Sequence, residues 1–164
     1  VIIFSCSVAA QWSLDREKGV REAIAEYPDM EVVQIIETGT EDQQVYATIE
    51  NAIRANPDVK NFATLCAVTT PVTGRVIKRM DMAGEVVHVG HDLETETLSN
   101  IKDGATNASL SQDPFKQGYE AVRSLYNYIQ AGVVPEDIDT GVLRVDEANI
   151  DAYLQKLEEG EPIG

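Results

Sequence analysis

The chain has 164 residues, enough for one domain with a full hydrophobic core, because a chain of this length buries roughly two-thirds of its unfolded surface. Its 28 acidic and 13 basic residues give a net charge of −15, which repels phosphate backbones and anionic membranes and so excludes direct contact with nucleic acid. A transcription regulator could still carry a separate basic DNA-binding domain. No apolar run has the length of a membrane span, and the first residues, VIIFS, are too short for a signal sequence. Because the chain opens within a predicted strand and without Met, we expect it to be part of a longer protein.

Short apolar runs alternate with amphipathic stretches along the whole chain. The runs predict strands at residues 1–5, 31–37, 61–65, 86–89, 106–110 and 141–145. The amphipathic stretches predict helices at residues 14–27, 41–55, 72–83, 95–103, 114–131 and 149–159. This alternation predicts a single α/β domain over residues 1–164, with three layers (αβα), a mostly parallel sheet and right-handed crossovers.

Apolar spacing predicts which helix faces are buried. In the helix at 41–55, Val45, Ile49 and Ile53 recur at four-residue steps. The helix at 14–27 has a similar predicted face, consisting of Val20, Ala23, Ile24 and Tyr27. The strand at 86–89, rich in β-branched residues, is predicted to be buried as in a covered parallel sheet.

Polar side chains follow three of the predicted strands. Asp92 comes just after the strand at 86–89, and Gln112 holds the equivalent place after the strand at 106–110. Arg16 lies in the first turn of the helix after the first strand, where the helix dipole disfavours a cation, so a polar partner should compensate. Ligands of open parallel sheets bind in the crevice beyond the carboxyl ends of the strands. We therefore expect these three side chains to face one crevice.

Each of these residues also has an ordinary structural explanation. Arg16 could form a surface ion pair with Asp15 or Glu17, Asp92 could cap the helix that follows it, and Gln112 could be a loop glutamine without a ligand. As ligand groups they suit a neutral polyol. An ionised carboxylate only accepts hydrogen bonds, a glutamine amide donates and accepts, and a guanidinium can donate a pair of hydrogen bonds to adjacent hydroxyls.

Three segments carry a family resemblance: VGHD at 89–92, IKDGATNASLSQDPFKQGYEAV at 101–122 and IDTGVLRVDEANIDAY at 138–153. They resemble the C-terminal part of sugar-binding proteins of the periplasmic-binding-protein type I superfamily. That superfamily includes receptors of sugar ABC importers and effector domains of regulators of the lactose-repressor type. The resemblance implies that Asp92 and Gln112 hydrogen-bond sugar hydroxyls, and that Arg16, three residues before Gly19, grips the sugar.

Two further residues are candidate ligand contacts. Trp12, the only tryptophan, could stack on the apolar face of a sugar ring or pack in the core. Thr70 belongs to the predicted loop after the third strand, where relatives often offer a polar group. The sequence departs from these relatives at Leu65, where they have an asparagine, and at Thr40, where some have an aromatic residue.

Catalysis, metal binding and cofactor binding have little support in the sequence. His88 and His91 lie within and beyond a strand, so their side chains need not converge on a metal. There is no G-x-S-x-G elbow, Walker-type loop or G-x-G-x-x-G loop, so we expect no enzyme and no cofactor. Cys6 and Cys66 lack metal-type or redox-type spacing. A disulfide between them is geometrically allowed, but buried free thiols are the favoured expectation.

The favoured functional hypothesis is the C-terminal lobe of a sugar-binding receptor of an ABC importer, periplasmic or lipid-anchored outside the cell. Its partners would be a small neutral sugar, the missing N-terminal lobe and the ABC permease. The alternative is the effector domain of a cytoplasmic lactose-repressor-type regulator, which would reach DNA through a separate domain.

The helix at 114–131 has an unusually aromatic face that includes Phe115, Tyr119 and Tyr126. In the resembled proteins the corresponding helix packs on the other lobe. We therefore expect the chain alone either to fold this helix onto its own sheet or to self-associate through it, and to bind free sugar weakly or not at all.

Overall fold

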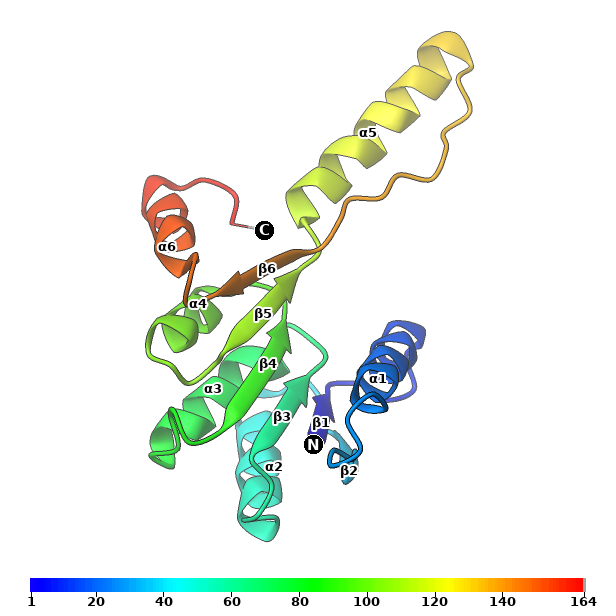
Figure 1. Cartoon of the computed structure of the whole chain (residues 1–164). Coiled ribbons are helices and arrows are strands. Elements are labelled where there is room, and N and C mark those ends of the chain that lie inside the picture. The colour runs from blue at the N-terminus through cyan, green and yellow to red at the C-terminus, as the bar shows by residue number, and fades with distance from the viewer. Residues whose placement is uncertain (164) are drawn as a thin grey trace.

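A six-stranded sheet forms the centre of the computed structural model, which describes residues 1–163 (Figure 1). The strands are β1 (Ile2–Ser5), β2 (Gln34–Glu37), β3 (Asn61–Thr64), β4 (Val87–His91), β5 (Ala108–Ser111) and β6 (Leu143–Asp146). Their order across the sheet is β2-β1-β3-β4-β5-β6, with β1 to β5 parallel and β6 antiparallel to β5. The predicted three-layer α/β fold with a mostly parallel sheet is confirmed.

The helices are α1 (Gln11–Ile24), α2 (Asp42–Ala55), α3 (Thr69–Arg79), α4 (Thr95–Lys102), α5 (Pro114–Ala131) and α6 (Ile150–Glu159). In the row α2, α3, α4 and α6, each helix packs on the next. Helix α1 lies on the other side of the sheet (Figure 1), as right-handed crossovers require when the chain reverses its direction across the sheet after β2. In residues 1–163 no helix is long and apolar enough to cross a membrane.

The core lies between the sheet and the row of helices that contains α2 and α3. The predicted inner residues of α2, Val45, Ile49 and Ile53, are all buried. In α3, Val72, Val76 and Ile77 are buried as well. The main cluster consists of Ile2, Phe4, Val45, Ile49, Ala52, Ile53, Phe62, Val72, Val76, Ile77, Val86 and Ala105.

The opposite side of the sheet is sparsely covered, and two sequence predictions are wrong there. The apolar face predicted for the first helix is not buried, since Tyr27 is 58% exposed and Ser13 is the buried residue of α1. The strand predicted as buried has one exposed face, on which Val87 and Val89 are 47% and 37% exposed. The physical reason is the same in both cases: within residues 1–163, α1 is the one helix on this side.

Helix α3 begins at Thr69, three residues earlier than predicted, so the loop after β3 is shorter than expected. Thr69 donates a side-chain hydrogen bond of 3.0 Å to the carbonyl oxygen of Cys66, and the Thr70 hydroxyl lies 3.1 Å from the same oxygen. Pro71 fits the first turn because its missing N–H would have no partner there. Gly90 of β4 permits close approach of this turn, since a Cβ at Gly90 would lie 2.2 Å from Cγ2 of Thr70.

Helix α5 projects away from the sheet, and residues 132–142 return beside it to β6 (Figure 1). Its bounds match the prediction, with Pro114 in the first turn and Gly132 as a left-handed C-cap at φ 66°. It has no buried residue, and Val122 and Ile129 are 70% and 67% exposed. The expectation that this helix folds onto the chain's own sheet is therefore wrong.

Candidate functional site

Asp92 and Gln112 meet at the carboxyl ends of the neighbouring strands β4 and β5. The Gln112 Nε2 atom donates a hydrogen bond of 2.8 Å to Oδ1 of Asp92. Strand β5 also fixes the Asp92 backbone, since its N–H donates to the Leu110 carbonyl at 2.8 Å and its carbonyl accepts from Ser109 Oγ at 2.7 Å. Asp92 has a left-handed backbone with φ 68°, a conformation uncommon outside glycine and concentrated at functional sites.

The side chain of Asp92 is directed at Gln112 rather than at the next helix. Helix α4 has Glu94 at its N-cap and no side-chain capping hydrogen bond. The capping alternative for Asp92 is therefore not what the structure shows. The cap of this type lies one strand further on, where Asp113 accepts a hydrogen bond of 2.9 Å from the backbone N–H of Lys116 in α5.

Arg16 reaches from α1 to the carboxyl end of β3. One of its terminal nitrogens, Nη1, donates a hydrogen bond of 2.6 Å to the carbonyl oxygen of Leu65. Its guanidinium lies 5.3 Å from the centre of the Trp12 ring. Within residues 1–163 Arg16 forms no ion pair, so the alternative of a surface pair with Asp15 or Glu17 does not apply. A guanidinium has five N–H donors, and most of these are left for a ligand.

His91, the last residue of β4, is close to both Arg16 and Asp92. Its Nδ1 atom is 2.8 Å from the carbonyl oxygen of Thr64. Burial lowers the pKa of His91 below its ordinary value, and the positive charge of Arg16 lowers it further. The hydrogen bond to the Thr64 carbonyl and the negative charge of Asp92 oppose this shift only in part. The ring is therefore neutral at neutral pH and lies in the fields of both Arg16 and Asp92. From the sequence, His91 was a candidate only for metal binding, although its place directly before Asp92 was a signal for this site.

Arg16, His91, Asp92 and Gln112, together with Trp12, are called the edge cluster below. The first four are half-buried, and Trp12 is 38% exposed, so the alternative that Trp12 belongs to the core does not hold. Three parts of the sheet edge contribute to it: the ends of β4 and β5, the carbonyl after β3, and the first turns of α1. Its groups offer hydrogen-bond donors, acceptors and one aromatic face within a single polar region.

Thr70, the fifth predicted ligand residue, is not brought to this surface. It is fully buried, and its hydroxyl lies 2.9 Å from Thr64 Oγ1 and 2.8 Å from the His91 carbonyl oxygen, to which it donates. The backbone N–H of His91 in turn lies 3.1 Å from the same hydroxyl. Thr70 of α3 therefore fixes the backbone of His91 from the side of the sheet that α3 covers.

Cys6 and Cys66 form a disulfide between the segments that follow β1 and β3, with their Cα atoms 6.4 Å apart. That separation lies within the usual range for disulfides. The expectation of free thiols is corrected accordingly. It failed because sequence spacing does not reveal that β1 and β3 are neighbours in the sheet. The bridge links Cys6, in the loop before α1, to Cys66. Cys66 directly follows Leu65, whose carbonyl oxygen accepts the hydrogen bond from Arg16.

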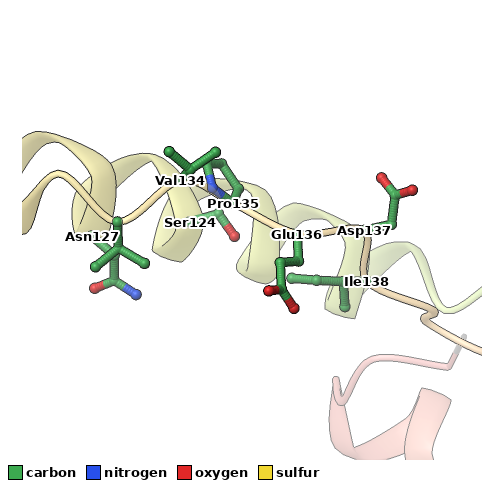
Figure 2. A pocket seen from close by; sticks show the side chains of 8 residues that line it. Ser124, Asn127, Val134, Pro135, Glu136, Asp137 and Ile138 are labelled. Carbon is green, nitrogen blue, oxygen red and sulfur yellow. The ribbon is translucent and has the colours of Figure 1, made fainter.

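One cavity of the surface lies outside the edge cluster. A shallow cavity of about 310 Å³ lies between α5 and the returning segment, lined by residues such as Asn127, Pro135 and Ile138, and shares no residue with the edge cluster (Figure 2). Within residues 1–163 no group of three or more His, Cys, Asp or Glu side chains is arranged to hold a metal ion.

Comparison with known proteins places these features in a family. The family described as periplasmic binding protein domain matches residues 1–132. The xylose/arabinose-binding protein XylF of Sulfolobus acidocaldarius is 30% identical over 129 residues, which are 74% of this chain and 32% of that protein.

Solved structures give the same result at the level of the fold. A solute-binding protein of an ABC transporter from Burkholderia graminis, in complex with D-arabinose, superposes with a TM-score of 0.86 at 28% identity. The superposed part covers 93% of this chain and 54% of the Burkholderia graminis protein. A solute-binding protein from Agrobacterium vitis with bound D-fucose has a TM-score of 0.85 at 25% identity, covering 92% and 52%. The chain thus spans about a third of the curated relative and about half of these structures, and it belongs to the periplasmic binding protein domain family.

Proposed function

We propose that this chain is the C-terminal lobe of a two-lobed sugar-binding protein that serves an ABC importer. The observation that carries the proposal is the edge cluster, in which Asp92 is hydrogen-bonded to Gln112, Arg16 is held at the end of β3, and His91 is close to both Arg16 and Asp92. The family membership and the sugars named for the relatives support it. The relatives described above are transport proteins, so we favour an importer receptor over a repressor-type regulator.

The chemistry of the cluster suits a neutral polyol. Gln112 occupies Oδ1 of Asp92, which leaves Oδ2 to accept from sugar hydroxyls. The amide hydrogen bond also orients the carboxylate before the ligand arrives, which lowers the entropy lost on binding. Arg16 can donate from the opposite side while its guanidinium remains against the Trp12 ring. No group here is arranged for turnover, and we propose binding rather than catalysis.

The cluster supplies only one wall of a site. Since the chain spans about half the length of the solved relatives, we propose that a second lobe supplies the other wall and that the two close around the sugar by a hinge. In this proposal the exposed face of α5 packs on that second lobe, and the closed form is the one recognised by a permease. The receptor would act in the periplasm or anchored outside the cell, and the disulfide fits such an oxidising compartment.

A sugar screen on the full-length gene product tests the proposal. Thermal shift would be measured with D-arabinose, D-xylose, D-fucose and D-ribose, and each hit would be followed by calorimetry. We expect saturable binding of at least one neutral monosaccharide and a rise in melting temperature that grows with its concentration. Absence of binding to every sugar, or chemical change of a bound sugar, would contradict the proposal.

The isolated 164-residue chain provides a second test, through light scattering after size exclusion. We expect self-association through α5 and weak or absent sugar binding. The double variant Val122→Glu with Ile129→Glu should shift the chain towards monomer, because both side chains belong to the exposed apolar face. Asn127→Glu with Gln130→Glu adds the same charge at exposed polar positions and should leave the association unchanged. A monomeric wild-type chain with micromolar sugar affinity would show that the second lobe is dispensable.

A further inference from the structure

The chain contains two histidines, both in β4, and their hydrogen bonding differs. His88 is fully buried, and each of its ring nitrogens contacts a threonine hydroxyl, Thr64 at 3.0 Å and Thr106 at 2.9 Å. The ring of His91 has one hydrogen bond within the described residues, from Nδ1 to the backbone carbonyl of Thr64. Its second ring nitrogen is therefore the one whose use remains to be explained.

The contact at Nδ1 determines which nitrogen carries the proton. A carbonyl oxygen can only accept, so Nδ1 of His91 must be the N–H donor to Thr64. The ring is neutral, because burial lowers its pKa below the ordinary histidine value. In a neutral ring with the proton on Nδ1, Nε2 bears a lone pair and can only accept a hydrogen bond.

The Nε2 atom has no protein partner within residues 1–163, yet it is not among the buried polar atoms that lack one, which are Thr97 Oγ1 and Asn100 Oδ1. It is therefore accessible from outside. Its charged neighbours are Arg16, from α1, and Asp92, which follows it in the chain. Strand β5 contributes the uncharged Gln112, and the end of β3 contributes the Thr64 carbonyl.

We propose that Nε2 of His91 accepts a hydrogen bond from a ligand hydroxyl between Arg16 and Asp92, and that it is a specificity-determining residue of the sugar site. The assignment rests on the function proposed above. The Thr64 carbonyl holds the ring at Nδ1 and the Thr70 hydroxyl holds the His91 backbone, so the acceptor has a fixed direction. A fixed acceptor selects a hydroxyl at one position and in one configuration, whereas Arg16 can reorient its several donors.

The tautomer can be tested without any ligand, by long-range ¹H–¹⁵N correlation spectra of the 164-residue chain at neutral pH. The two histidines can be assigned with the variant His91→Gln. We expect a neutral His91 ring with Nδ1 protonated and Nε2 bare. A charged ring, or a proton on Nε2, would overturn the proposal because the acceptor would not exist.

The role in binding is tested on the full-length protein with the sugar that binds best in the screen, of which D-arabinose is the first choice. His91→Phe keeps a ring but removes the acceptor, and we expect roughly tenfold weaker binding. His91→Gln places an amide oxygen within reach of the same point and should recover part of the loss. Thermal melts of both variants separate misfolding from a lost contact.

Monodeoxyfluoro derivatives of the same sugar give the sharper test. Fluorine in place of a hydroxyl removes the donor that Nε2 requires. One derivative should therefore bind the wild type more weakly than the parent sugar but bind His91→Phe as well as the parent does. If the wild type binds sugar and His91→Phe binds it equally, the role of His91 is refuted and the proposed function stands. If no sugar binds the wild type, the proposed function fails and this inference fails with it.

Discussion

The two faces of β4 carry polar groups that are organised in opposite ways. Successive strand residues point to opposite faces, so His88 and His91, three positions apart, lie on different sides of the sheet. On the side covered by α3, His88 belongs to a closed network with Thr64 and Thr106 in which every ring nitrogen has a partner. His91 belongs to the edge cluster, where donors and acceptors remain open. The closed network should therefore govern stability, and the edge cluster should govern binding.

The largest expected effect is a loss of stability from filling the space between Gly90 of β4 and Thr70 of α3. Gly90→Ala would place a Cβ 2.2 Å from Thr70 Cγ2, in a turn that cannot retreat without breaking its hydrogen bonds. We expect a loss of about 3 kcal/mol in the free energy of unfolding, measured by urea denaturation. Gly118→Ala is the matched control, because a Cβ there would meet nothing within 4 Å. Equal stability of the two variants would show that the α3–β4 contact is loose.

The second largest effect should be a loss of folding stability in acid, caused by His88 of the closed network. Burial lowers the pKa of His88 to about 3, so between pH 6.5 and 3 the unfolded chain binds a proton that the folded chain does not. Stability from this group is therefore full above pH 6.5 and falls as the pH drops, by about 2.5 kcal/mol between pH 6.5 and 4.5.

His91 acts in the same direction, since its pKa is lowered too. Urea denaturation at a series of pH values measures the slope. His88→Gln should flatten most of it, while His91→Gln should flatten less. A slope unchanged by His88→Gln would assign the acid sensitivity to the carboxylates instead.

On the open side, the largest change in affinity should come from Asp92→Ala. We expect sugar binding by the full-length protein to weaken by about 2 kcal/mol, the usual scale for hydrogen bonds of a charged group, measured by calorimetry. Asp92→Asn keeps an acceptor for Gln112 and tolerates the left-handed backbone, so it separates the loss of charge from a change of conformation. Unchanged affinity in both variants would remove Asp92 from the site.

The smallest expected effect is that of Gln112→Ala, about 1 kcal/mol in affinity, because the amide of Gln112 offers the sugar only a neutral hydrogen bond and Asp92 keeps its charge. The double variant with Asp92→Ala should lose less than the sum of the two single losses, since the side chains contact each other. Strict additivity would mean that Gln112 does not orient Asp92.

Local sequence signals predicted much of this structure. Apolar spacing predicted the buried face of α2, and Pro114 with Gly132 predicted both ends of α5. The ends of two strands predicted that Asp92 and Gln112 would come together. Whether they bind sugar stays a prediction.

The failures share one cause, which is that burial depends on neighbours that a local pattern does not contain. Helix α1 has an apolar face that stays largely exposed, and Val87 is 47% exposed. Thr70 was expected in a loop and became part of a helix, because its hydroxyl found partners in β3 and β4. His91 was missed because Arg16, whose charge lowers the pKa of His91, is distant in sequence.

The excursion made by α5 leaves the sheet and returns to it at adjoining positions, because Ser111 of β5 is paired in register with Leu143 of β6. In topological terms, β5 and β6 are the arms of a hairpin with an oversized loop. Residues 113–141 could be replaced by a two-residue Asn-Gly turn, which would keep this register and suits antiparallel arms. The shorter loop would lower the entropy of closure by about 2 kcal/mol, and no buried side chain of α5 would be lost. The sheet with its polar edge is therefore separable from the helix, and the shortened hairpin would keep Gln112 at the end of β5.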